Sequence, residues 1–276
     1  MGRLDGKIAL VTGAARGQGR SHAVAMAREG ASIIAVDICR QIETVTYPLA
    51  GSEDLAETAR EVEALDRRCV TAEVDVRDRD ALHAAITHGV DSLGGLDIVI
   101  ANAGVWEVHL DEPTDPAERA AIWRDTLDIN LTGVWNTVES TAPILVDQGR
   151  GGAMVFTCSI QGLKGAGNND ISLTAYTASK HGLVGLMRCT AQDLAPHSIR
   201  VNTVHPTGVL TPMIANEVVP AYAEKHPRLA AVMSNALPVD VVDPHDVSEA
   251  VLFLVSDSGR YITGVTLPVD AGALVK

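Results

Sequence analysis

The sequence predicts an α/β fold, a doubly wound parallel sheet of about seven strands with helices on both faces. Short runs rich in Val, Ile and Ala alternate along the chain with longer segments of helical periodicity. Most of these runs are continuously apolar, which is typical of parallel strands covered on both faces. Alternating strands and helices imply right-handed crossovers, and such crossovers build a sheet of this kind.

The elements are expected in strict alternation. Apolar runs predict strands at 7–12, 32–37, 69–75, 96–102, 153–159, 199–206 and 265–270. Helical periodicity predicts helices near 17–30, 53–65, 79–93, 116–148, 174–195 and 245–256. Two segments fall outside the pattern: an insertion, residues 38–52, and residues 207–244, whose prolines and apolar positions predict a helical flap. Because no linker or composition break interrupts the alternation, we expect a single domain over residues 1–276.

Composition narrows the class of partner. The chain has 22 Lys+Arg against 35 Asp+Glu, and its net charge of −13 disfavours nucleic acid and anionic membranes as partners. Four separated cysteines, without CxxC or Cys/His clustering, predict reduced thiols and no metal site. The chain also lacks an apolar run of the roughly 18 residues that a membrane span needs, and a signal-peptide pattern. We therefore expect a soluble, cytoplasmic protein.

A glycine-rich turn follows the first expected strand. Thr12-Gly13-Ala-Ala-Arg-Gly17-Gln-Gly19 opens the first helix, where a glycine backbone can approach a pyrophosphate and the helix N-terminus stabilises it. Asp37 ends the second strand, where a carboxylate accepts hydrogen bonds from an adenosine ribose and repels a 2′-phosphate. Arg16 argues for NADP instead, although it can also contact pyrophosphate. The pattern predicts a Rossmann-type site for NAD.

Tyr176 and Lys180 lie four residues apart on an expected helix and therefore share one face. A cation beside a phenol lowers the pKa of the phenol from about 10 and makes it a usable base. The alternative is an amphipathic helix with an isolated tyrosine and a solvated lysine, because this spacing alone is common.

Together with the order TGxxxGxG, Asp37, IANAG (100–104), Asn130, Ser159 and Y-x-x-x-K, this pair makes the chain resemble the short-chain dehydrogenase/reductase family. The resemblance implies that Tyr176 is the catalytic acid/base and that Lys180 lowers its pKa and holds the nicotinamide ribose. It also implies that Ser159 bonds the substrate oxygen and that Asn130 holds a water in a proton relay from Lys180. The alternatives are a turn-capping hydroxyl for Ser159 and a helix-interior amide bonded to backbone for Asn130.

The same resemblance implies a larger set of cofactor contacts. These residues are Gly13, Arg16, Gly17, Gln18, Gly19, Asp37, Asp75, Val76, Asn102, Ala103, Gly104, Tyr176, Lys180, Pro206, Val209 and Thr211. The chain departs from the family pattern at Ala101, which replaces an asparagine, and at Pro206-Thr207-Gly208, which replaces Pro-Gly. The segment 163–173 is longer than usual and is expected to bulge beside the substrate pocket.

The insertion and the segments GLKGA, KHGLVGLMR and HPTGVLTPMI are similar to the mycofactocin-coupled, or carveol-dehydrogenase-like, subfamily. That resemblance implies NAD that does not exchange and electron transfer to an external redox carrier, mycofactocin. The insertion is a candidate clamp because it starts beside Asp37; the alternative is a surface loop without a role. The family resemblance further implies a homotetramer.

The expected pocket wall limits the class of substrate. It consists of Trp106, Leu210 and Met213, joined by Val209 and Ile214. Because no Arg or Lys is expected there, the wall favours a neutral, apolar secondary alcohol or ketone of the terpenoid kind. Trp106 is equally compatible with a core or interface position.

Other residues and functions were weighed against this interpretation. His205 and His181 flank the site, but a strand-end histidine before proline is typically structural. Two other functions remain open, an NADPH-dependent ketoreductase and a non-catalytic NAD-binding sensor; a sugar-nucleotide epimerase fits the glycine spacing less well.

Overall fold

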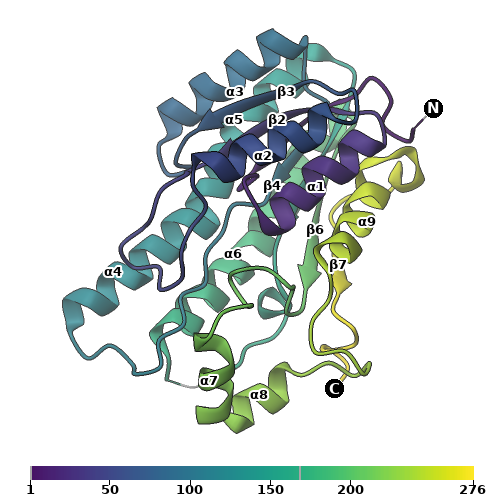
Figure 1. Cartoon of the computed structure of the whole chain (residues 1–276). Coiled ribbons are helices and arrows are strands. Elements are labelled where there is room, and N and C mark those ends of the chain that lie inside the picture. The colour runs from purple at the N-terminus through teal and green to yellow at the C-terminus, as the bar shows by residue number, and fades with distance from the viewer. Residues whose placement is uncertain (1, 168) are drawn as a thin grey trace.

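The computed structural model describes residues 2–167 and 169–276, and a parallel sheet of seven strands runs through this part of the chain (Figure 1). The strands are β1 (Ile8–Thr12), β2 (Ser32–Asp37), β3 (Cys69–Glu73), β4 (Ile98–Ala101), β5 (Gly152–Thr157), β6 (Ile199–Pro206) and β7 (Thr266–Val269). They lie in the order β3-β2-β1-β4-β5-β6-β7, and every pairing is parallel. The predicted fold class is confirmed.

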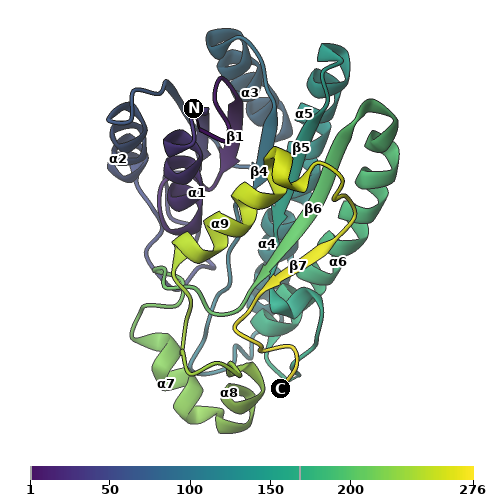
Figure 2. The same ribbon diagram turned by 90° about the vertical axis from the view of Figure 1, so that its right-hand side faces the viewer.

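Helices cover both faces of the sheet, as Figure 2 shows. One face carries α1 (Gly17–Arg28), α2 (Ser52–Glu63) and α9 (Pro244–Val255), and the other carries α3 (Arg79–Leu93), α5 (Gly133–Gln148) and α6 (Ile171–Leu194). Each face has its own hydrophobic core of aliphatic side chains. The inner strands are therefore buried throughout, whereas the edge strands β3 and β7 are only partly covered.

The helix expected over 116–148 is interrupted. It consists of α4 (Pro116–Leu127), a π-helical turn η1 (Asp128–Thr132) and α5. A π-turn carries one extra residue within the helix, a device that is frequent at functional sites. Asn130 lies in the middle of this π-turn, and its side chain is fully buried.

The strand order reverses between β1 and β4. The chain builds β2 and β3 on one side of β1 and later β4 to β7 on the other, so the connections that leave β1 and β4 diverge. Ligands of doubly wound sheets bind in the crevice outside the carboxyl ends of the strands at this point. In this chain the residues after the two strands touch: a Cβ added at Gly13 would lie 2.9 Å from the Ala103 Cα.

The predicted flap contains two short helices, α7 (Val218–Lys225) and α8 (Pro227–Met233), which lie beyond the carboxyl edge of the sheet (Figures 1 and 2). The C-terminal tail returns to the end of this flap, where Ala236 and Leu237 donate their N–H groups to the Ala271 carbonyl at 3.0 and 2.9 Å. Within the described residues, no helix has the length and apolar character needed to cross a membrane.

The two phenylalanines of the chain provide a matched test of the core. Phe156 in β5 is 0% exposed, whereas Phe253 in α9 is 39% exposed. We expect Phe156→Ala to lower the free energy of unfolding by about 3–5 kcal/mol, because it leaves a cavity in the sheet core. Phe253→Ala should cost less than about 1 kcal/mol. Urea unfolding of both variants measures the difference, and equal losses would contradict the described burial.

Candidate active site

Two cavities open at the carboxyl edge of the sheet. The first, here called the turn cavity, is lined by the glycine-rich turn and by most of the predicted cofactor contacts, namely Gly13, Arg16, Gly17, Gln18, Gly19, Asp37, Asp75, Val76, Asn102, Ala103, Gly104 and Thr211. The second, the flap cavity, measures about 770 Å³ and is lined by Ser159, Tyr176, Pro206 and Val209 together with the flap. Gln18, Thr211 and Met213 line both, so the two cavities adjoin.

The glycine-rich turn requires glycine for steric reasons. Gly13 and Gly17 have φ of +66° and +57°, in the left-handed region that side chains disfavour. A Cβ at Gly19 would lie 1.9 Å from the Gly13 carbonyl oxygen. The N-terminus of α1 can therefore sit directly against the turn, with its first N–H groups available to an anion.

Asp37 stabilises this turn from the end of β2. Its Oδ2 accepts the Ala15 N–H at 2.9 Å and its Oδ1 accepts the Cys39 N–H at 3.2 Å. Burial raises the pKa of the Asp37 carboxyl above its ordinary value, while these backbone N–H groups and Arg16 act in the opposite direction. Because a carboxylate has about four lone-pair sites, two backbone bonds leave acceptor capacity toward the turn cavity.

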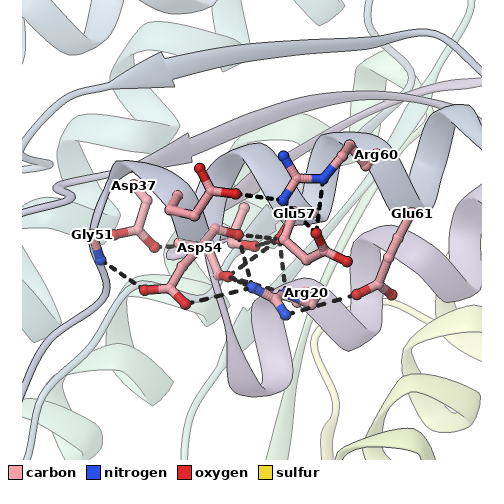
Figure 3. A network of polar contacts seen from close by, with 11 residues as sticks. Arg20, Asp37, Gly51, Asp54, Glu57, Arg60 and Glu61 are labelled. Carbon is pink, nitrogen blue, oxygen red and sulfur yellow. Dashed lines mark hydrogen bonds and ion pairs between the residues drawn. The ribbon is translucent and has the colours of Figure 1, made fainter.

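The turn is also fixed to α2 by a polar network (Figure 3). The Arg20 guanidinium donates to the Ala15 and Asp54 carbonyls at 2.6 and 2.7 Å. Thr58 donates its hydroxyl proton to the Ala14 carbonyl at 2.9 Å, and Gly51 donates its N–H to Asp54 Oδ2 at 2.8 Å. The carbonyls of the turn are thus bonded on the side away from the turn cavity, which fixes its conformation.

The insertion 38–52 is a folded wall of the turn cavity. Gln41 organises it: its amide donates to the Val45 carbonyl and accepts the Leu49 N–H, both at 2.9 Å. Five of its residues line the turn cavity, namely Ile38, Ile42, Tyr47, Leu49 and Ala50. The sequence identified the segment, but no local pattern indicated these individual contacts.

Hydrogen bonds to distant segments also hold the insertion to the rest of the molecule. Arg16 donates to the Pro48 carbonyl, Thr44 donates to Asp125 Oδ2 at 2.7 Å, and Thr46 donates to the Val108 carbonyl at 3.1 Å. Arg16 is therefore engaged with the insertion.

Tyr176, Lys180 and Ser159 come together where α6 passes the end of β5. Ser159 hydrogen-bonds to Tyr176, and the Lys180 Nζ lies 5.5 Å from the centre of the Tyr176 ring. Lys180 is buried and donates to the Thr157 carbonyl at 2.9 Å. The i, i+4 spacing thus places both side chains on one helix face, as the sequence predicted, with Lys180 buried and Tyr176 half-buried at the cavity wall.

The pKa directions differ from the sequence-based expectation. Burial raises the pKa of Tyr176 above its ordinary value, and the hydrogen bond with Ser159 only partly opposes this. Burial likewise lowers the pKa of Lys180. The expected lowering of the Tyr176 pKa by Lys180 was therefore wrong for these residues alone, because desolvation of the phenolate outweighs the favourable contacts.

Asn130 holds the loop that follows β4. Its Oδ1 accepts the Val105 N–H and its Nδ2 donates to the Val105 carbonyl, both at 2.8 Å. A Cβ at Gly104 would lie 3.2 Å from Asn130 Oδ1 and 3.5 Å from Lys180 Nζ, so Gly104 separates the two polar groups. This geometry agrees with the alternative stated for Asn130, an amide bonded to backbone.

The flap cavity is mostly apolar. Trp106 lines it, is buried and packs beside Tyr176, with ring centroids 6.0 Å apart; it also belongs to a small apolar cluster with Leu173 and Tyr222. Gln161 is a wall residue that no sequence pattern indicated. Asn168, within the expected bulge 163–173, lies outside the described residues, and Ala166 in the same segment is buried in that cluster.

Two expectations about the flap cavity were wrong. Leu210 lines neither cavity and is 54% exposed, whereas Val209 is buried. Val209 forms an isolated parallel bridge with Val242, and both side chains belong to the hydrophobic core on the α1/α9 face of the sheet. A lysine also lines the cavity: Lys276 of the tail, whose Nζ donates to Ser234 Oγ at 2.7 Å and to the Asn235 carbonyl at 3.2 Å.

Comparison with known proteins identifies the family. A family model described as Enoyl-(Acyl carrier protein) reductase matches residues 13–273. The chain is 46% identical to (-)-trans-carveol dehydrogenase of Rhodococcus erythropolis over 284 residues, which cover 100% of both chains. The chain belongs to the short-chain dehydrogenase/reductase family. The family resemblance seen in the sequence is confirmed, and the protein is an oxidoreductase.

Solved structures of other short-chain dehydrogenases agree with this assignment. Carveol dehydrogenase from Mycobacterium avium, in complex with NAD, is 51% identical with a TM-score of 0.91 over 100% of both chains. A short chain dehydrogenase from Mycobacterium paratuberculosis, bound to NAD, is 44% identical with the same TM-score and coverage. The similarity therefore extends over the insertion and the flap as well as the sheet.

Glu107, next to Trp106, is a buried carboxyl that supports a pH prediction. Thr126 donates to its Oε2 at 3.1 Å, while its Oε1 has no partner among residues 2–167 and 169–276. Burial raises the pKa of Glu107 from 4.5 to about 7. A raised acid pKa means that the folded state binds the proton more tightly, so this stabilisation is present below about pH 4.5 and is lost as the pH rises through 7.

We expect Glu107→Gln to remove this loss of stability at higher pH, because the amide does not ionise. The stability of the variant relative to the wild type should rise by about 2.5 kcal/mol between pH 5 and pH 8.5, since one pKa unit corresponds to about 1.4 kcal/mol. Urea unfolding at the two pH values measures it, with the exposed Glu118→Gln as control. A stability difference that does not change with pH would contradict the prediction.

Proposed function

We propose that this protein is an NAD-dependent oxidoreductase that interconverts an apolar secondary alcohol of the terpenoid kind and its ketone, with Tyr176 as acid/base. The observation that carries the proposal is the position of Ser159 and Tyr176 on the wall of the flap cavity, with Lys180 buried behind them. The similarity to carveol dehydrogenase and to two NAD complexes supports it.

The turn cavity fits NAD on the chain's own chemistry. The glycine cradle and the first N–H groups of α1 suit the pyrophosphate, and Asp37 suits an adenosine ribose. The acidic Asp37 and the engagement of Arg16 with Pro48 both disfavour a 2′-phosphate, and with it the NADPH-dependent ketoreductase. Bound NAD supplies the hydride acceptor in alcohol oxidation.

The chain's residues orient the alcohol and take its proton. Ser159 Oγ accepts the Gln161 N–H at 3.2 Å, and in the proposal its hydroxyl proton, which lies within reach of Tyr176, is donated to the substrate oxygen. In the proposal, Tyr176 Oη accepts the alcohol proton during oxidation and returns it during reduction. Because burial opposes the phenolate, the positive charge of Lys180 is needed to stabilise it.

Asn130 and Lys180 are proposed to continue the proton path through a water beside Gly104, the residue that separates their polar atoms. Retention of the buried Asn130, Ser159 and Lys180 around the half-buried Tyr176 favours an enzyme over a non-catalytic NAD-binding sensor.

The substrate class follows from the flap cavity. Its volume of about 770 Å³ and its largely apolar wall suit a terpenoid-sized molecule. Lys276 Nζ directs two of its three N–H donors to Ser234 and Asn235, which reduces its capacity to bind a carboxylate substrate. These features favour a neutral alcohol.

The insertion 38–52 is proposed to clamp the nucleotide. Tyr47 is 6% exposed and lines the turn cavity, and release of the nucleotide past it would require breaking the bonds to Arg16, Val108 and Asp125. Such a clamp suits NAD that does not exchange and passes its electrons to an external carrier such as mycofactocin. By family resemblance we also propose a single-domain, cytoplasmic homotetramer.

The catalytic proposal is tested by Tyr176→Phe. We expect turnover of carveol to fall by at least about 10³-fold, because the acid/base is lost. Thermal unfolding and nucleotide binding should remain close to wild type, since the phenyl ring preserves the packing beside Trp106. Parallel assays with NAD and NADP check the nucleotide preference. Activity retained in Tyr176→Phe would refute the mechanism.

The clamp is tested by the absorbance at 340 nm after carveol is added anaerobically, first without added NAD and then with excess. We expect a rise that stops near one reduced nicotinamide per subunit in both cases. In Thr46→Val, which weakens the fastening of the insertion to Val108, added NAD should extend the rise. A wild-type rise that continues with added NAD would mean an exchanging, conventional dehydrogenase.

A further inference from the structure

We propose that His205 is a positioning residue that fixes Ser159 for proton donation to the substrate, an inference that rests on the proposed function. His205 is fully buried near the end of β6 and lines neither cavity. Its Nδ1 lies 2.7 Å from the Ser159 carbonyl oxygen, and its Nε2 lies 2.7 Å from Thr203 Oγ1. Any effect of His205 on the reaction must therefore pass through Ser159.

The hydrogen bonds select one tautomer. A carbonyl oxygen only accepts, so Nδ1 carries the ring proton and donates it to Ser159. Nε2 then accepts the hydroxyl proton of Thr203. Burial lowers the pKa of His205 to about 4, partly opposed by the bond to Ser159, so the ring stays neutral near pH 7. The imidazole is thus a fixed donor with both nitrogens engaged.

The position of His205 explains why a side-chain hydrogen-bond donor is needed at this point of β6. The ladder between β5 and β6 reaches the pair Thr157↔Val204, and the Cys158 N–H still donates to the Val204 carbonyl at 2.9 Å. Pro206 has no N–H, so the backbone of β6 cannot donate the next ladder bond. The His205 ring supplies a donor to Ser159, in the segment that follows β5, at the point where the backbone of β6 lacks one.

The bond controls the orientation of the Ser159 hydroxyl. Ser159 stands between β5 and the short 3-10 helix η2 (Ile160–Gly162), where its Oγ caps the helix by accepting the Gln161 N–H. With its carbonyl held by His205 and its Oγ by Gln161, the residue has little freedom to turn away from Tyr176. Loss of one anchor displaces the hydroxyl by a fraction of an ångström, and displacements near 1 Å cost up to about 10²-fold in rate.

Two substitutions of His205 distinguish the effect of losing its hydrogen-bond donor from the effect of changing its packing. His205→Leu keeps an apolar side chain of similar size but removes both bonds, whereas His205→Asn can place an amide N–H near the Nδ1 position. With carveol as substrate, we expect His205→Leu to lower kcat about tenfold or more with KM changed less than about threefold. His205→Asn should recover most of kcat. Nucleotide affinity should be unchanged in both variants.

His22→Leu is the matched control. His22 is equally buried, and its Nδ1 bonds Ser248 Oγ at 2.8 Å between α1 and α9, away from Ser159. It should lose stability without losing kcat per folded subunit. Wild-type kcat in His205→Leu, or an equal loss in His205→Asn and His205→Leu, would overturn the inference. If His205→Leu does not fold, Thr203→Val replaces it: a several-fold lower kcat is expected, and an unchanged kcat overturns the inference.

An activity-independent readout separates this inference from the proposed function. Histidine ¹⁵N NMR of the wild type, assigned by the signal lost in His205→Asn, should show a neutral ring protonated at Nδ1 that does not titrate near pH 6.5. An Nε2-protonated or titrating ring would overturn the positioning role. Absence of turnover in the wild type, with the Nδ1 tautomer present, would instead refute the proposed function or its substrate.

Discussion

The reversal of strand order between β1 and β4 is the constraint on which the rest of the molecule depends. Because all seven strands in the described chain are parallel, their carboxyl ends meet at one edge, and the reversal opens a crevice there. The Gly13–Gly19 turn, Asp37, the loop at Asn102–Gly104 and Ser159 all follow strand ends. Residues distant in sequence thus reach one site.

The sequence predicted those parts of the site that a short local pattern encodes. The glycine turn, Asp37 and the Tyr176–Lys180 pair depend on a strand end or a single helix face, and the structure places them as expected. Contacts that no local pattern encodes were not predictable: Gln41 organises the insertion through bonds to backbone, and Val209, which pairs with Val242, is buried whereas Leu210 is exposed. The direction of the Tyr176 pKa shift was missed because the degree of burial cannot be obtained from spacing.

Polar groups buried around the site are costly for the fold. Lys180, Asp37, His205 and Glu107 are all nine-tenths or more buried, and the first three retain partners that offset their desolvation. Glu107 has one oxygen without a partner among the described residues. Buried groups with shifted pKa values are concentrated at functional sites. The chemistry there requires polar groups that a fold selected for stability alone would not bury.

The loop after β4 links the two cavities mechanically. Asn130 holds this loop by hydrogen bonds to Val105, and the Trp106 ring packs beside Tyr176. The next two residues are also bonded: Glu107 accepts the Thr126 hydroxyl proton, and the Val108 carbonyl accepts that of Thr46 in the insertion. The residue bonded to the insertion, Val108, is only two residues from Trp106 along the same loop. The proposed clamp and the wall of the flap cavity therefore share one continuous segment, which contacts the insertion at Val108 and Tyr176 at Trp106.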